Sequence, residues 1–320
     1  MGKIRAILSK KLGRELGIIV ALAILVLVFS LIDPIYISPG NLVDIVDQST
    51  IYGLLALGIT FVIITGGIDL SVGSVMAVII VSIGKVLTGA GLSPTLSVLL
   101  GIGLGFGLGA FNGVLVTKIK LQPFIATLST MSVYRGLAYI ITKGWPVLDI
   151  PDEFRKMLDG DVFGVIPKAI IILLAFAGIG HVLIRYTKFG TYIYAVGGNE
   201  EATRLSGVNV DRNKILAYGI CGIGASLAGM VLLARLGTGE PTAGAGYELN
   251  AIAAAAVGGV SLSGGKGSML GTLLGAVLLS ALRVGLVVVG VDSFWQYIAT
   301  GVIIAVAAYL EVFQNKFSKR

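Results

Sequence analysis

Histidine, cysteine and charge are all scarce in this sequence. The 320 residues include one histidine, His181, and one cysteine, Cys221. One cysteine excludes an intramolecular disulfide and a metal site built from cysteine alone. One histidine excludes histidine-pair metal sites and leaves little basis for a Ser-His-Asp triad. We therefore expect no catalytic residues and no metal, and an integral membrane enzyme is the least favoured interpretation.

Nucleotide-binding motifs are also missing. No GxxxxGK[ST] segment occurs, so the chain has no P-loop with which to bind and hydrolyse ATP. The glycine-rich segment 101–113 contains no strict GxGxxG and follows no predicted strand, which argues against a dinucleotide loop. Its glycines at 101, 105, 109 and 113 repeat at the spacing of one helical face, which indicates a packing surface. We expect no cofactor.

What the sequence has in excess is apolar residues. They make up 56% of the chain, charged residues make up 13%, and the mean hydropathy is +0.95. A soluble domain of this size cannot bury that much apolar surface, so lipid must solvate it. The apolar runs are continuous rather than alternating, which favours helices over a barrel. The net charge of +7 is concentrated at the ends of these runs, so it does not indicate a nucleic-acid partner.

Apolar segments recur along the whole chain, and most have the roughly 20 residues that a helix needs to span a bilayer. We predict an all-α polytopic transmembrane bundle of about ten helices. The segment at 248–260 is short and only mildly hydrophobic, so it is either a half-helix or a shielded interior span. The predicted spans are 16–32, 45–66, 70–88, 94–117, 123–142, 165–186, 214–235, 248–260, 268–289 and 294–311.

Basic residues predict the orientation. Residues 1–15 are basic and precede an apolar run with no cleavage site, so we expect an uncleaved first span and a cytoplasmic N-terminus. The membrane-spanning region 16–312 would contain a cytoplasmic loop at about 187–213, and 313–320 would be a basic cytoplasmic tail. The acidic loop 143–164 then lies outside. Arginines 135, 235 and 283 fall near outer ends, where we expect them to pair with Asp44, Asp47, Glu240 or Glu248, or Arg135 and Arg283 to snorkel.

The longest polar interval between two apolar spans is 197–208. It predicts a short helix that is entered through a flexible Gly197-Gly198 and ends at the glycine C-cap Gly207. A charged helix on the cytoplasmic side suits a protein partner. An ordinary solvated connector is the alternative.

Two glycine-rich segments resemble each other: 66–73 and 258–265. Gly66, Gly67, Gly258 and Gly259 predict broken helices beside a transport pathway, or else two similar tight turns. Asp69 is nearly alone as an intramembrane acid, so it is either a pathway residue or a helix cap. This scarcity of buried acids argues against an ion-coupled secondary carrier.

Four separated segments closely resemble ribose/monosaccharide-type ABC transporter permeases, and the resemblance covers roughly residues 45–312. The segments are 58–74, 191–199 with its continuation through Ala202 and Gly207, 241–249, and 258–265. The resemblance implies a subunit of an ATP-driven importer in the bacterial plasma membrane, moving a monosaccharide such as a ribose-like pentose or a hexose. Similar permeases carry nucleosides, autoinducers or branched-chain amino acids, and these alternatives stay open.

The resemblance also implies partners. It implies a second permease subunit in a homodimer or pseudo-dimer, two cytoplasmic ABC ATPase domains and an extracytoplasmic sugar-binding protein. The polar interval would be the coupling helix that sits in a groove of the ATPase. Its coupling residues would be Gly198, Asn199, Glu200, Glu201, Ala202, Arg204 and Gly207.

Overall fold

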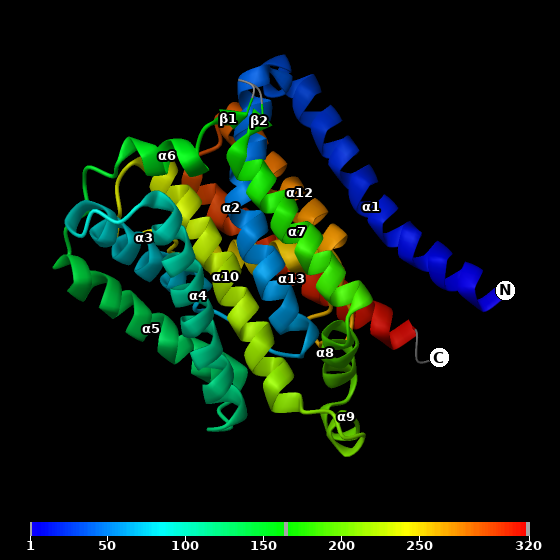
Figure 1. Ribbon diagram of the computed structural model, residues 1–320. Helices are drawn as coiled ribbons and strands as arrows, with labels where there is room; N and C mark the ends of the chain where they lie inside the picture. Colours follow the sequence, from blue (N-terminus) through cyan, green and yellow to red (C-terminus); the bar gives the residue numbers. More distant parts are fainter. Residues whose placement is uncertain (1, 163–165, 318–320) are drawn as a thin grey trace.

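The computed structural model describes residues 2–162 and 166–317, and this part of the chain is almost entirely helical (Figure 1). The strands found in it are the two-residue β1 (Asp161–Val162) and β2 (Ile166–Pro167), which form one antiparallel pair. The predicted all-α bundle is therefore confirmed. The helices are α1 (Gly2–Ile32), the 3-10 helix η1 (Pro34–Ile37), α2 (Pro39–Ile64), α3 (Val72–Gly89), α4 (Pro94–Thr117), α5 (Pro123–Thr142), α6 (Asp152–Leu158), α7 (Lys168–Tyr186), α8 (Lys188–Gly198), α9 (Glu200–Leu205), α10 (Val210–Leu236), α11 (Tyr247–Val257), α12 (Met269–Val288) and α13 (Ser293–Phe317).

Within the described residues, eight helices are long and apolar enough to cross a membrane: α1, α2, α3, α4, α5, α7, α10 and α12. They correspond to eight of the ten predicted spans. The predicted span 248–260 is the short helix α11, which has 11 residues, and the predicted span 294–311 falls within α13. Prolines set several starts, because proline suits the first turn of a helix. Pro39 and Pro94 follow the N-caps Ser38 and Ser93, whose hydroxyls accept backbone N–H groups.

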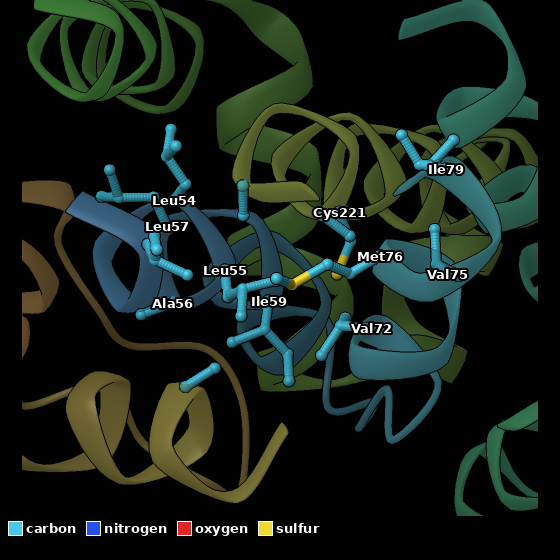
Figure 2. Packing of buried hydrophobic residues seen from close by; sticks show 14 of the residues in the cluster. Leu54, Leu55, Ala56, Leu57, Ile59, Val72, Val75, Met76, Ile79 and Cys221 are labelled. Atoms are coloured by element: carbon cyan, nitrogen blue, oxygen red, sulfur yellow. The ribbon is translucent and has the colours of Figure 1, made fainter. Parts of the chain in front are cut away.

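Helix α2 is the centre of the bundle. Of the 18 residues that make up its most apolar stretch, 89% are buried, whereas the corresponding share in α1, at the edge of the molecule, is 11% (Figure 1). A helix that is apolar on all sides needs neighbours on all sides. Figure 2 shows Leu55 and Ile59 of α2 meeting Met76 of α3 and Cys221 of α10. Cys221 is buried and free, so it is a core residue.

The glycine face of α4 packs against α10, as its spacing predicted. A Cβ built on Gly109 would overlap the carbonyl oxygen of Tyr218, and one on Gly113 would lie 2.6 Å from the Cα of Ile215. A Cβ on Gly107, off this face, would meet nothing within 4 Å. The absence of side chains therefore lets the two helix backbones approach closely.

The three outer arginines find different partners. Arg235 pairs with Asp47 at 3.3 Å and with Asp159 at 3.5 Å, so its predicted carboxylate partner is partly right. Arg135 instead donates to the carbonyl oxygens of Pro241 and Ala243, both at 2.8 Å. These contacts hold α5 to the segment that precedes α11.

Arg283 has no carboxylate within salt-bridge distance in the described part of the chain. It donates to Tyr52 and, at 2.9 Å, to Gln296. Pairing with an acid is thus the wrong expectation for Arg135 and Arg283, because backbone carbonyls and neutral side chains supply their acceptors.

Candidate coupling helix and glycine junction

Helices α8 and α9 lie at the end of the bundle opposite α6, β1 and β2 (Figure 1). Gly197 and Gly198 belong to α8, so the prediction of a flexible Gly-Gly entry is wrong. The change of direction comes one residue later, at Asn199, whose side-chain oxygen accepts the Ala202 N–H at 2.9 Å and caps α9. A polar cap residue therefore separates two helices where glycines were expected to do so.

The predicted glycine end of α9 is confirmed. Gly207 has a φ of +82°, and its N–H donates to Arg204 O at 3.1 Å. The next N–H, of Val208, reaches back to Thr203 O at 3.4 Å. This pair of bonds is a Schellman motif, which needs the left-handed conformation that glycine adopts at least cost.

Ion pairs attach α9 to its neighbours. Glu200 accepts hydrogen bonds from Arg204 at 3.2 Å and from Lys214 of α10 at 2.5 Å. Arg204 also donates to Asp211 at 3.0 Å, and Asp211 accepts from Lys118, after α4, at 2.8 Å. Charges of alternating sign thus link α9 to α10 and α4. The helix is a fixed element in this structure.

The pKa of Glu200 reflects this network. Partial burial alone would raise it, but the hydrogen bonds and positive charges of Lys214 and Arg204 outweigh burial, and the pKa lies below its ordinary value. Hydrogen bonds from Arg204 to Asp211 and Glu200 likewise raise the pKa of the guanidinium.

All of the predicted coupling residues are exposed on this helix and its approach. The sequence interpretation missed Leu205, which is 83% exposed, the most exposed large apolar side chain among those described. Thr203, in contrast, is buried and donates its hydroxyl to Asn199 O at 2.7 Å. The helix therefore presents a mixed surface with an apolar tip, while its inner side is fixed to the bundle. In the sequence, this tip is indicated only by one leucine within an otherwise polar segment.

The two resembling glycine segments end their helices in the same way. After α2, Gly66 donates to Ile63 O at 2.9 Å and Gly67 to Val62 O at 3.1 Å. After α11, Gly259 donates to Ala256 O and Val260 to Ala255 O, both at 2.9 Å. Both are Schellman motifs, with φ of +80° at Gly66 and +86° at Gly259. The tight-turn alternative is confirmed, and a role of these glycines in the pathway stays a prediction.

The tertiary structure brings these segments together beside α8. Gly265 donates its N–H to Ile64 O at 2.9 Å, and the Tyr194 hydroxyl of α8 donates to Gly267 O at 2.7 Å. A Cβ built on Gly197 would overlap the Ile64 carbonyl oxygen, and one on Gly264 would lie 3.0 Å from Gly66. We call this contact of α8 with both glycine segments the glycine junction. It connects α9, through α8, to the breaks after α2 and α11.

Gly67 and Gly258 serve close packing. A Cβ on Gly67 would lie 2.7 Å from the Tyr218 hydroxyl oxygen, and one on Gly258 would lie 2.7 Å from the Cα of Thr272. A side chain at Gly67 would therefore displace the Tyr218 side chain, and one at Gly258 would displace the backbone of α12.

Asp69 lies between α2 and α3 and is 1% exposed. Its Oδ1 accepts the backbone N–H of Ser71 at 2.9 Å and the Ser71 hydroxyl at 2.7 Å, just before α3 begins. Asn112 of α4 donates to Ser71 Oγ at 2.7 Å and approaches both carboxylate oxygens at 3.4 Å. The carboxylate therefore has local structural partners, as the cap alternative expected, although Ser71 rather than Asp69 is the N-cap residue of α3. Its place in a pathway stays a prediction.

No group of three or more histidine, cysteine, aspartate or glutamate side chains in the described residues could hold a metal ion. The candidate site consists of the exposed helix α9 and the glycine junction.

Comparison with known proteins assigns the family. Residues 41–307 match the family described as branched-chain amino acid transport system / permease component. No solved structure matches the chain.

Three similar proteins cover nearly all of the chain. The ribose import permease protein RbsC of Bacillus subtilis (strain 168) is 43% identical over 93% of this chain and 92% of its own. The protein of the same name in Escherichia coli (strain K12) is 41% identical over 92% of each chain. The probable ABC transporter permease protein YphD of Escherichia coli (strain K12) is 38% identical over 96% of this chain and 92% of its own. The chain, a multi-pass membrane protein, therefore belongs to the branched-chain amino acid transport system / permease component family and is a transport component of ABC type rather than an enzyme.

Proposed function

We propose that this chain is the membrane-spanning subunit of an ATP-driven importer that carries a monosaccharide, with ribose as the first candidate. One observation carries the proposal: identity of 41–43% to proteins named as ribose import permeases extends over more than nine-tenths of the chain. The exposed α9 supports it, because the chain has no P-loop and needs a partner that hydrolyses ATP.

The family implies an ATPase and a substrate-binding protein as partners. We assign the ATPase to α9, where Leu205 is the apolar anchor and Glu201 an exposed charge beside it. A buried apolar anchor within a polar rim is the usual form of a protein interface. Closure of the ATPase would displace α9, and the glycine junction would transmit that displacement to the ends of α2 and α11. Two copies of the chain would form the pathway between them.

The orientation follows from charge. Lys118, Arg204 and Lys214 lie at the α9 end, and the acidic residues of α6 and the β1 strand lie at the other. By the positive-inside rule, α9 and both termini would lie in the cytoplasm of a bacterial cell, with the chain in its inner membrane. The α6 end would face the sugar-binding protein.

The test is reconstitution of the chain in liposomes with its ATPase and binding protein. Pentoses, hexoses, nucleosides and branched-chain amino acids are offered in turn, and solute uptake and ATP hydrolysis are measured together. Uptake of ribose or another monosaccharide, coupled to hydrolysis, is the expected result. Uptake of leucine or valine alone would favour the solute named in the family description. Uptake along an ion gradient without ATP would refute the importer.

A further inference from the structure

A cavity of about 190 Å³ lies between α2, α11, α12 and α13, away from the glycine junction. Drug-sized ligands occupy roughly 300–1,000 Å³, so this space suits a smaller molecule. Its wall combines leucine side chains with aromatic and polar ones. The aromatic and polar lining residues are Tyr52, Tyr247, Asn250, Arg283, Gln296 and Thr300, together with Tyr297 at its edge.

Gln296 provides the first sign of a ligand. The residue is 8% exposed and lines the cavity. Its Oε1 accepts the Arg283 Nε–H at 2.9 Å, and its amide nitrogen donates to no acceptor among the described residues. The two N–H groups of this amide are therefore available to an acceptor that enters the cavity.

Arg283 provides the second sign of a ligand. It lies on α12, a membrane-length helix, and its charge is balanced by no carboxylate within 4 Å in the part of the chain described. The guanidinium stacks 5.6 Å from the Tyr52 ring centroid and donates to the Tyr52 hydroxyl and to Gln296. An arginine carries five N–H donors, so it retains capacity for a ligand after these contacts.

The aromatic pair gives the cavity a shape suited to a ring. Tyr52 and Tyr247 lie with centroids 5.0 Å apart and their planes inclined at 56°. Aromatic faces accept the C–H groups of a small ring, while amide and guanidinium groups bind its hydroxyls. Asn250 adds an amide whose oxygen accepts the Thr300 hydroxyl at 3.4 Å and whose nitrogen donates to Gly246 O at 3.2 Å, which leaves one N–H group for a ligand.

We propose that this cavity is a transient monosaccharide site within the permease, where Tyr247 contacts the sugar ring and Gln296, Arg283 and Asn250 bind the sugar hydroxyls, while Tyr52 holds Arg283 in place. The site rests on the proposed function and names where the solute pauses within the membrane. A lipid acyl chain fits less well, because it offers no acceptor to Gln296 or Arg283 and leaves them desolvated.

The test measures sugar transported per ATP hydrolysed in liposomes that hold the complete complex and saturating loaded binding protein. Gln296→Leu removes one set of hydrogen bonds and should lower this ratio by roughly 2- to 10-fold. Tyr247→Ala removes an aromatic wall and should lower it by about tenfold or more. Tyr247→Phe retains the ring and should restore most of the loss. Gln48→Leu, on α2 but outside the cavity, is the matched control and should leave the ratio unchanged.

ATP hydrolysis that stays within about twofold of the wild type would show that the variants fold and dock. If they do not fold, a second measurement replaces them. Leu249→Cys places a thiol at the cavity wall, and the transported sugar should slow its reaction with a charged thiol reagent.

Three results would overturn the site. One is an unchanged transport ratio in both Gln296→Leu and Tyr247→Ala, and another is no protection of the Leu249→Cys thiol. The third is a phospholipid that mass spectrometry finds retained by the wild type and lost from Gln296→Leu, which would make the cavity a lipid site. Failure of the wild type to move any sugar would instead refute the proposed function.

Discussion

Gly197 offers the sharpest test of the glycine junction. In Gly197→Ala the new methyl group would overlap the Ile64 carbonyl oxygen and approach the Gly265 nitrogen, the two atoms that join the glycine segments. Neither neighbour is a flexible side chain that can rotate away. Either α8 must move outward or the bond between Ile64 and Gly265 must break.

Two effects of opposite sign set the free-energy cost of Gly197→Ala. Alanine in place of glycine within a helix stabilises that helix by about 0.5–1 kcal/mol. Overpacking a tight contact costs about 1–3 kcal/mol, so the net cost lies between about 0 and 2.5 kcal/mol. The upper end applies because the overlapped Ile64 oxygen belongs to the backbone, and about 2 kcal/mol is a factor of about 30 in the population with α8 in its native position. We therefore expect transport to fall at least several-fold while α8 itself stays helical.

The assay compares sugar uptake, ATP hydrolysis and membrane insertion in the reconstituted complex. Gly178→Ala in α7 is the matched control, because a Cβ there meets nothing within 4 Å and only the gain in helix stability remains. We expect Gly178→Ala to transport normally and Gly197→Ala to insert normally but to lose coupled uptake. If both variants transport alike, the junction does not transmit the motion of α9, and the reasoning is refuted.

Three further predictions concern the coupling helix and the bundle. Reversing charge at both Glu201 and Arg204 should abolish uptake without reducing the amount of protein in the membrane; normal uptake would identify α9 as a solvated connector. Gly109→Val should lower the free energy of unfolding by about 1–3 kcal/mol through overpacking of α4 against α10, measured as a lower melting temperature, whereas Gly107→Val should not, since that position is open. The pKa of Glu200 is below its usual 4.5, so its ion pairs stabilise α9 fully above about pH 4.5 and are lost as the pH falls through the lower folded value. The protection of the α9 amides against hydrogen exchange, corrected for the intrinsic exchange rate at each pH, should therefore fall on acidification below pH 4.5 in the wild type. It should fall less in Glu200→Gln, in which Asp211 still pairs with Arg204, and an identical fall in both proteins would contradict the assignment.

Local sequence patterns determined most of the fold. Continuous apolar runs of membrane length gave eight spans that the structure contains, because a helix in lipid satisfies its own backbone hydrogen bonds. The four-residue glycine spacing in α4 predicted a packing face, and Gly207 predicted the end of α9. Each of these is a property of one helix or one turn, so neighbouring residues are sufficient to encode it.

Some local predictions were wrong because a polar group other than the expected one caps the helix or accepts the hydrogen bond. Gly197 and Gly198 were expected to be flexible, but Asn199 caps α9 and both glycines stay within α8. Arg135 and Arg283 were expected to find acids or to snorkel, but carbonyl oxygens, Tyr52 and Gln296 accept their hydrogen bonds. Several groups compete for an arginine, and the sequence does not state which of them is near.

Only the tertiary structure decided how the helices combine into a site. The sequence showed two resembling glycine segments nearly 200 residues apart, yet it did not show that Gly264 of one lies against Gly66 of the other, or that Gly197 lies against Ile64 and Gly265. It showed Tyr52, Arg283 and Gln296 on three separate segments, yet not that they line one cavity. Such contacts depend on helix crossing angles and on backbone approach across the bundle, which are set jointly by all the packed side chains. Composition and periodicity therefore determined that the chain is a helical membrane protein, and packing alone determined where α9 is anchored and where the cavity lies.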